Sequence, residues 1–177
     1  MTASQTRLVA ILTGIAGAAA LRLVPHPPNF TPIGAMALFG GAYLGRRGLL
    51  LALAAPLGAL LISDLVLGFY DGMLIQYVAV ALVAVLGWTV LSKSKSPVRV
   101  GLSAIAGSLI FFFVTNFGVW AVSGMYPLNA AGLAACFTAA IPFFQNTLAG
   151  DLFYATLLFG GFALLEKAVP RLSAQVA

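Results

Sequence analysis

The sequence predicts an all-α integral membrane protein, a single bundle of six transmembrane helices over residues 1–177 with both termini in the cytoplasm. Three observations predict this class. The 177 residues are 62% hydrophobic and only 7% charged, whereas soluble domains carry about 25% charged residues. Apolar runs recur along the whole chain between short polar breaks. Basic residues gather in those breaks, and lysine and arginine in such positions orient a membrane protein.

Six apolar runs are candidates for transmembrane helices. They cover residues 8–24, 33–45, 48–68, 73–91, 101–122 and 147–165. The second run is short, since at 1.5 Å per residue it covers about 20 Å, against about 30 Å of hydrocarbon. It follows a segment, residues 25–32, that contains four prolines and cannot continue a helix. We therefore expect part of that segment to lie at membrane depth, covered by protein or by a watery cavity.

The distribution of basic residues decides between six and seven spans. With six spans, eight of the nine basic residues fall on the inner side and only Arg22 lies outside. A seventh span over residues 130–144 would place Lys167 and Arg171 outside. We therefore expect residues 130–144 to be re-entrant or to lie near the outer surface. The first run could instead be a signal peptide, because Ala18-Ala19-Ala20 resembles a cleavage site, but the later apolar runs favour a retained first helix.

Several function classes are poorly supported. The net charge of +5 does not indicate nucleic-acid binding, because the basic residues form short clusters between apolar runs. The chain has no G-x-x-x-x-G-K-S/T loop and no H-E-x-x-H motif. Its single histidine, His26, and single cysteine, Cys136, provide neither a catalytic pair nor a zinc site of protein ligands. We therefore expect no enzyme, no ion channel and no intrinsic cofactor.

Apart from the basic residues of the predicted inner side, most ionisable residues lie on the predicted outer side. Asp64, Asp71 and Asp151 lie there together with Arg22 and His26. Charges near the bilayer are costly unless they face a partner or a cavity. Two interpretations stay open: a structural ion pair of Arg22 with Asp64 or Asp151, or an outward-facing polar pocket. Because Arg22 is the only outer cation, at least two of the three aspartates need water or a ligand.

A pocket at this level would use tyrosine and asparagine side chains as well as the charged groups to bind a small polar ligand. The candidate ligand-binding residues are His26, Asn29, Asp64, Tyr70, Asp71, Asn146 and Asp151. As a lone residue, His26 is either a loop histidine hydrogen-bonded to backbone or one axial ligand to a metal that a macrocycle already holds.

Small residues recur every fourth position in the first run, at Ala10, Gly14 and Ala18 and again at Ala16 and Ala20. Small residues at this spacing let helices approach closely. The pattern therefore indicates either packing inside the bundle or a docking face for another membrane subunit.

These features resemble the substrate-binding S components of energy-coupling-factor vitamin transporters. In that family an A-x-x-x-A pattern in the first helix docks on a transmembrane coupling subunit that works with ATPases, and Ala16 and Ala20 match it. Residues 25–32, 63–68 and 142–151 resemble a family of small bacterial membrane proteins of unassigned function, akin to the solitary cobalamin-specific S components.

The cobalamin-specific proteins have a histidine in the first outer loop and an aspartate that closes the third span, which His26 and Asp64 match. They also carry a cobalt-binding cysteine after that aspartate, and residues 70–77 contain none. The resemblance implies an S-component-like uptake protein of the bacterial cytoplasmic membrane, with a corrinoid ligand and His26 as an axial ligand to its cobalt. A smaller cationic vitamin, bound mainly by the aspartates, is the alternative ligand. A structural or accessory membrane subunit, with the aspartates paired to Arg22 and no cavity, is the alternative function.

Overall fold

The computed structural model describes residues 2–173, apart from the side chains of Arg171 and Ser173, and this part of the chain is helical without strands. The helices are α1 (Ala3–Leu21), α2 (Ile33–Leu44), α3 (Leu49–Leu67), α4 (Met73–Leu86), α5 (Pro97–Val122), α6 (Ala130–Ala155), α7 (Gly161–Ala168) and α8 (Pro170–Ser173). Short helical turns at Gly45–Arg47, Gly87–Leu91 and Thr156–Gly160 extend α2, α4 and α6.

Five helical stretches are long and apolar enough to cross a membrane, which confirms a multi-pass helical membrane protein. They are Ala3–Leu21, Leu49–Leu67, Met73–Leu91, Pro97–Val122 and Ala130–Ala168. Local signals in the sequence start several of them. The Thr2 hydroxyl caps α1 by accepting a hydrogen bond from the backbone of Gln5, and the Ser96 hydroxyl caps α5 just before Pro97.

Of the two alternatives expected for residues 130–144, a re-entrant segment is wrong, whereas a position near the outer surface stays a prediction. These residues begin a continuous helical stretch of 39 residues, Ala130–Ala168, which starts where the Asn129 side chain accepts a hydrogen bond from the backbone of Gly132. Pro142 lies inside this stretch without ending it, since transmembrane helices tolerate proline where neighbouring groups compensate the lost hydrogen bond. At 1.5 Å per residue the stretch is about 58 Å long, so it extends beyond the hydrocarbon core of about 30 Å.

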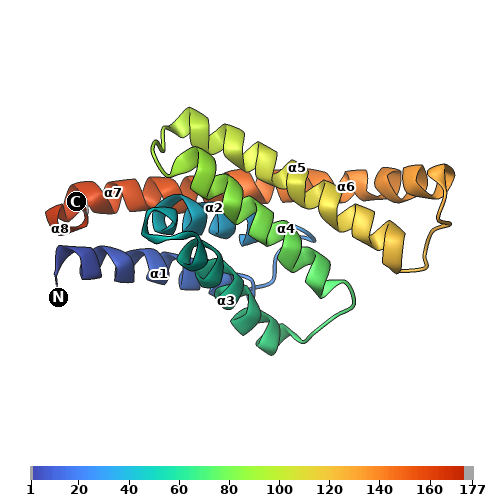
Figure 1. Cartoon of the computed structure of the whole chain (residues 1–177), viewed down its shortest axis with the longest axis horizontal. Coiled ribbons are helices and arrows are strands. Elements are labelled where there is room, and N and C mark those ends of the chain that lie inside the picture. Colours follow the sequence, from blue (N-terminus) through green and yellow to red (C-terminus); the bar gives the residue numbers. More distant parts are fainter. Residues whose placement is uncertain (1, 174–177) are drawn as a thin grey trace.

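The short helix α2 forms the centre of the bundle, in contact with α1, α3, α4, α5 and α6 (Figure 1). Eleven of its 12 residues are buried, because protein surrounds it on every side. Gly41 faces α4 so closely that a Cβ would overlap the carbonyl oxygen of Ala84, and a Cβ on Gly87 would overlap the carbonyl oxygen of Leu38. The glycines therefore allow α2 and α4 to pack backbone against backbone.

Both ends of the described chain lie at the same end of the molecule (Figure 1). Arg7 in α1 forms an ion pair with Glu166 in α7, with 2.6 Å between Nη2 and Oε1. Arg47 donates a hydrogen bond of 3.0 Å to the carbonyl oxygen of Ser4, which brings the end of α2 beside the start of α1. The α5–α6 hairpin forms the opposite end of the molecule, the α3–α4 loop lies part-way toward it, and the proline-rich loop lies near the middle (Figure 1).

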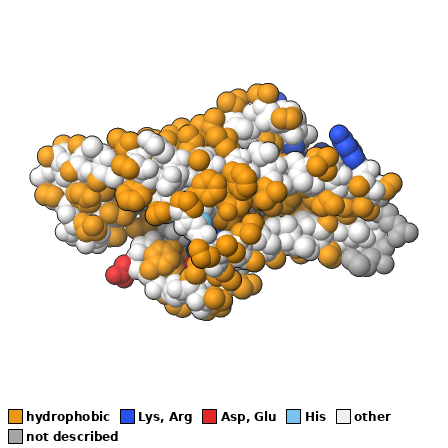
Figure 2. All heavy atoms as spheres, turned by 180° about the vertical axis from the view of Figure 1, so that it is seen from behind, with side chains coloured by type: hydrophobic (Ala, Val, Ile, Leu, Met, Phe, Trp, Pro, Cys, Tyr) orange, Lys and Arg blue, Asp and Glu red, His pale blue; other side chains and the backbone are white. Residues whose placement is uncertain are grey.

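Hydrophobic side chains cover most of the visible surface (Figure 2). The basic side chains visible in this view lie toward the end that holds the C-terminus, and the clearest acidic patch lies toward the other end. A surface of this kind is compatible with lipid along the sides of the bundle and with water at its two ends.

Candidate functional site

A cavity of about 360 Å³ lies beside the first turn of α2, between that turn and the middle parts of α5 and α6. Its walls come from the end of α1, the proline-rich loop, the α3–α4 loop, and helices α2, α4, α5 and α6. The lining residues are Arg22, Asn29, Thr31, Ile33, Gly34, Tyr70, Gln76, Phe111, Phe112, Thr115, Asn116, Ala140, Phe143, Phe144, Thr147 and Asp151. Three of the predicted ligand-binding residues, Asn29, Tyr70 and Asp151, are therefore brought together around one space.

Arg22 and Asp64 form a buried ion pair at the edge of this cavity. The distance from Arg22 Nη2 to Asp64 Oδ1 is 2.8 Å, and the two side chains are 7% and 0% exposed. Arg22 Nη1 also donates to the hydroxyl of Ser63, and Asp64 Oδ2 accepts a hydrogen bond of 2.9 Å from the Tyr77 hydroxyl. The structural ion pair predicted for Arg22 is thus confirmed with Asp64, which lies behind Arg22 and does not line the cavity.

Asp151 is the only aspartate that lines the cavity, and it is 3% exposed. Its Oδ2 accepts a hydrogen bond of 2.7 Å from the Ser108 hydroxyl of α5. The carboxylate also interacts with the backbone amide of Ala35 at the start of α2, and Gly34 leaves no room for a Cβ beside it. No ion pair joins Asp151 to a cation among the described residues.

Two loop residues complete the polar wall. Asn29 adopts a left-handed backbone conformation, with φ 62°, which asparagine tolerates better than most residues. Tyr70 lies between Gly68 and Gly72, whose φ values are 93° and 84°, so glycine is needed on both sides of the turn. Burial, followed by the neighbouring Asp64 carboxylate, raises the pKa of Tyr70 to about 12. Its hydroxyl therefore stays protonated near neutral pH and can donate a hydrogen bond.

The other predicted residues lie elsewhere. His26 lines neither this cavity nor the second one below; its Nδ1 is 3.0 Å from the carbonyl oxygen of Pro27, as expected of a loop histidine bonded to backbone. Asn146 donates a hydrogen bond of 2.9 Å to the carbonyl oxygen of Pro28 and so holds the proline-rich loop against α6. Asp71 is exposed on the α3–α4 loop. No group of three potential metal ligands occurs within residues 2–173.

A second cavity, of about 640 Å³, adjoins the first between the facing ends of α4 and α5. Asp71 contributes to its lining, together with apolar residues such as Val119 and Met125. Tyr70, Gln76 and Thr115 line both cavities, so their side chains form the wall between the two spaces.

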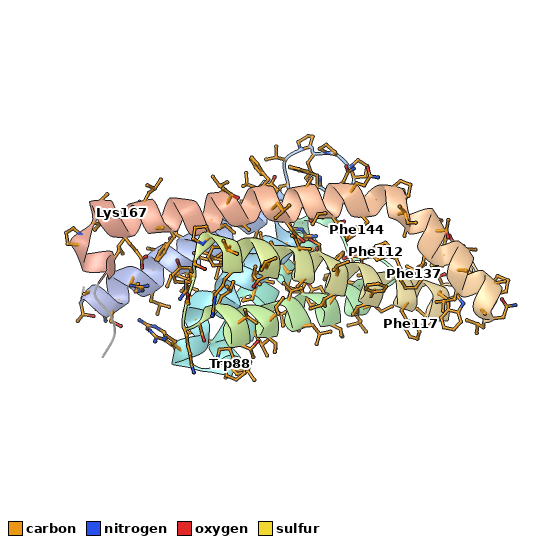
Figure 3. The ribbon with its side chains drawn as sticks, turned by 90° about the horizontal axis from the view of Figure 1, so that it is seen from above. Trp88, Phe112, Phe117, Phe137, Phe144 and Lys167 are labelled. Carbon is orange, nitrogen blue, oxygen red and sulfur yellow. The ribbon has the colours of Figure 1, made fainter. Side chains whose placement is uncertain are left out.

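Sequence reasoning missed the aromatic part of the first cavity. Phe111 and Phe112 of α5 and Phe143 and Phe144 of α6 all line it. The rings of Phe112 and Phe144 have centroids 4.9 Å apart, and Figure 3 shows these two residues with Phe137 along the contact between α5 and α6. The adjacent phenylalanine pairs were visible in the sequence, but helix packing alone explains such pairs, so they gave no specific signal of a ligand site.

The small residues of α1 form two faces with different surroundings. Ala18 is 3% exposed, and a Cβ on Gly14 would contact the Phe39 ring at 3.6 Å. Ala16 and Ala20 are exposed instead, and Gly17 between them has nothing within 4 Å of a Cβ position. The first stripe therefore packs inside the bundle, whereas Ala16 and Ala20 lie on the outside of the molecule.

Nearly all of the described chain matches one protein-family model. The match covers residues 2–172, and the model carries the description "Family of unknown function (DUF6580)". The chain belongs to the DUF6580 family. Comparisons with curated proteins and with solved structures found no match. For this member of DUF6580, functional inference therefore depends on the site itself.

Proposed function

We propose that this DUF6580 protein is a membrane uptake component that captures a vitamin-like small molecule in the cavity beside α2. The observation that carries the proposal is the buried carboxylate of Asp151, which lines a cavity of about 360 Å³ and has no cationic partner among the described residues. Such a group in a membrane bundle is costly and is typical of a functional site. Convergent polar groups in a partly apolar cavity are typical of small-molecule binding.

The proposed orientation places this cavity on the outer side of the bacterial cytoplasmic membrane. Six helical passes, with α2 as a short central one, put both termini on the cytoplasmic side. The end that holds the termini also contains Arg46, Arg47, Lys93, Lys95, Arg99 and Lys167. Cytoplasmic ends of membrane proteins carry such an excess of lysine and arginine, which supports an outward-facing cavity.

The exposed face of α1 supports the proposal that the protein docks on a transmembrane energy-coupling subunit. Ala16 and Ala20 match the small-residue pattern that docks S components on a transmembrane coupling subunit, and both are exposed. Small side chains on an exposed helix face allow a second helix to approach closely. In the proposed assembly, that subunit and its ATPases would drive release of the captured molecule.

For the ligand, the cavity supports a molecule smaller than a corrinoid. A volume of about 360 Å³ lies near the lower end of the range of about 300–1,000 Å³ for drug-sized ligands, and a corrinoid is much larger than a drug-sized molecule. His26, the axial ligand that the resemblance implies, does not line the cavity. Cobalamin binding would therefore need the proline-rich loop to move away from α6.

The test is native mass spectrometry of the detergent-purified protein, comparing wild type with a variant that fills the cavity. Ala140 lines the cavity, whereas Ala139 is exposed on the same helix. We expect Ala140→Phe to lose a small molecule that co-purifies with wild type, and the matched Ala139→Phe to retain it. Binding that survives in Ala140→Phe would contradict the proposal.

The alternative function is a structural or accessory subunit without a ligand of its own. The closed pair of Arg22 and Asp64 favours it, because this pair stabilises the bundle without any ligand. A wild-type protein that carries no small molecule but co-purifies with a second membrane protein would support this alternative.

A further inference from the structure

The charge balance around the cavity is unequal. Three charged side chains lie in its wall or directly behind it: Arg22, Asp64 and Asp151. Arg22 and Asp64 offset each other at 2.8 Å. Arg22 is further held by the Ser63 hydroxyl and, at 3.4 Å, by the Leu60 carbonyl oxygen. It is therefore fixed on α3, and the negative charge of Asp151 is left without a formal counter-charge.

Neighbouring dipoles offset only part of this charge. The Ser108 hydroxyl donates one hydrogen bond to Asp151, and the start of α2 lies against the carboxylate. A helix amino terminus provides the equivalent of about half an elementary charge. A buried carboxyl group that is stabilised only in this way either stays protonated or has a cation beside it, and a bound cation favours its ionised form.

The aromatic wall fits the same kind of ligand. Phe111, Phe112, Phe143 and Phe144 line the cavity that Asp151 lines. The face of an aromatic ring attracts a cation within about 6 Å of its centroid. The same faces also stack with a flat ring. A ligand that combines a positive charge with an aromatic ring would use both properties of this wall.

One further group points to a feature of the ligand. The buried amide nitrogen of Gln76 lies beside the Tyr70 hydroxyl and interacts with it, but it makes no hydrogen bond within normal limits of distance and angle. Gln76 and Tyr70 both line the cavity, and the Tyr70 hydroxyl can also donate. An acceptor group on the ligand would give these donors a better partner.

We infer that the cavity selects a small monocation with an aromatic ring and a hydrogen-bond acceptor, and that the positive charge of this ligand lies against Asp151. The inference rests on the proposed function and adds the ligand class to it. Asp151 is the counter-ion, the four phenylalanines surround the ring, and Gln76 donates to the acceptor.

The experiment uses three probes that share one ring and differ in charge: 1-methylnicotinamide as the cation, nicotinamide as the neutral molecule and nicotinate as the anion. Binding to the purified full-length protein is measured by isothermal titration calorimetry. We expect the cation to bind at least about tenfold more tightly than nicotinamide, because a buried charge pair is worth at least this factor, and nicotinate to bind least.

Substitutions at Asp151 test whether this residue causes the preference for the cation. Asp151→Asn should reduce the preference for the cation over nicotinamide to less than about twofold, whereas the matched Asp71→Asn, outside this cavity, should keep it. Asp151→Glu retains the charge and should keep part of the preference. If Asp151→Asn does not fold, the charge series on wild type and on Asp151→Glu decides the question.

The two proposals fail in different ways. Equal affinity for 1-methylnicotinamide and nicotinamide, or tighter binding of nicotinate, would overturn the monocation class. If that binding still disappears in Ala140→Phe, the capture function stands. If wild type binds none of the three rings, the monocation class is overturned; if it also carries no co-purifying molecule, the capture function is overturned with it.

Discussion

At the scale of single residues, the two buried aspartates, Asp64 and Asp151, have different surroundings. Asp64 has a cation, Arg22, and a phenol donor, Tyr77. Asp151 has a hydroxyl donor, Ser108, and the start of a helix. Arg22 can neutralise only one carboxylate, so the sequence already predicted that other aspartates would lack a cation. The structure adds which one is paired and shows that the unpaired Asp151 is buried at a cavity.

The ion pair of Arg22 and Asp64 should contribute strongly to stability. Asp64→Asn leaves the Arg22 charge buried without a counter-charge, so we expect the free energy of unfolding to fall by about 3–5 kcal/mol. Thermal unfolding in detergent measures the change. Glu166→Gln is the matched control, because the Arg7–Glu166 pair is 19% and 25% exposed and more exposed pairs contribute about 0–1 kcal/mol. Equal losses in the two variants would contradict this interpretation.

At the scale of helices, hydropathy located the apolar segments but could not determine how they pack. It predicted a short second run, and the structure has a 12-residue α2. It did not show that α2 is the central helix, because an apolar helix has the same composition whether lipid or protein surrounds it. The re-entrant alternative for residues 130–144 was also wrong, because the distribution of basic residues bears on the number of crossings and not on whether a segment is a continuous helix.

The same limit applies to the candidate site. Asn29, Tyr70 and Asp151 were identified because polar groups are rare and costly in a membrane chain. The phenylalanines were not, because apolar side chains carry no such signal. Gln76 was overlooked, although a polar side chain within the apolar run 73–91 carries the same signal. His26 was included through its uniqueness and through the resemblance, and the structure places it on the loop outside the cavity.

The contact between α2 and α4 gives a test at this scale. Gly41→Ala places a methyl group against the backbone of Ala84, which cannot move as a side chain can, so the free energy of unfolding should fall by about 1–3 kcal/mol. Gly58→Ala in α3 is the matched control, since nothing lies within 4 Å of its Cβ position. Alanine also favours a helix over glycine by up to about 1 kcal/mol. A Gly41→Ala protein as stable as Gly58→Ala would show that the two helices can separate at little cost.

At the scale of the whole molecule, the two ends of the bundle are built differently. Around the termini, Arg7 links α1 to α7 through Glu166 and to α8 through the carbonyl oxygen of Leu172. The Lys95 ammonium lies 4.6 Å from the centre of the Tyr43 ring, and burial together with Arg46 and Arg7 lowers the pKa of Lys95. Both cavities lie farther along the bundle, away from the termini. Contacts that close the bundle around the termini and cavities away from them agree with capture from one side.

The outer face of α1 gives a test of assembly. Ala16→Trp combined with Ala20→Trp should abolish uptake, or co-purification of a membrane partner, while thermal unfolding in detergent stays near that of wild type, because both positions are exposed. Ala18→Trp is the internal control: Ala18 is 3% exposed, so this variant should be strongly destabilised. An unfolded double variant would assign Ala16 and Ala20 to internal packing and end the docking proposal.

The proposed orientation in the membrane can be tested with reporter fusions. Reporter fusions in the loop between α4 and α5, within residues 92–96, and at the C-terminus should both report the cytoplasm, because the basic residues gather at that end. A fusion in the loop between α5 and α6, within residues 123–129, should report the periplasm and serves as the opposite control. A periplasmic signal from the C-terminal fusion would mean an odd number of crossings. A reversed result at all three sites would place the cavity in the cytoplasm, where it could not capture a molecule for uptake.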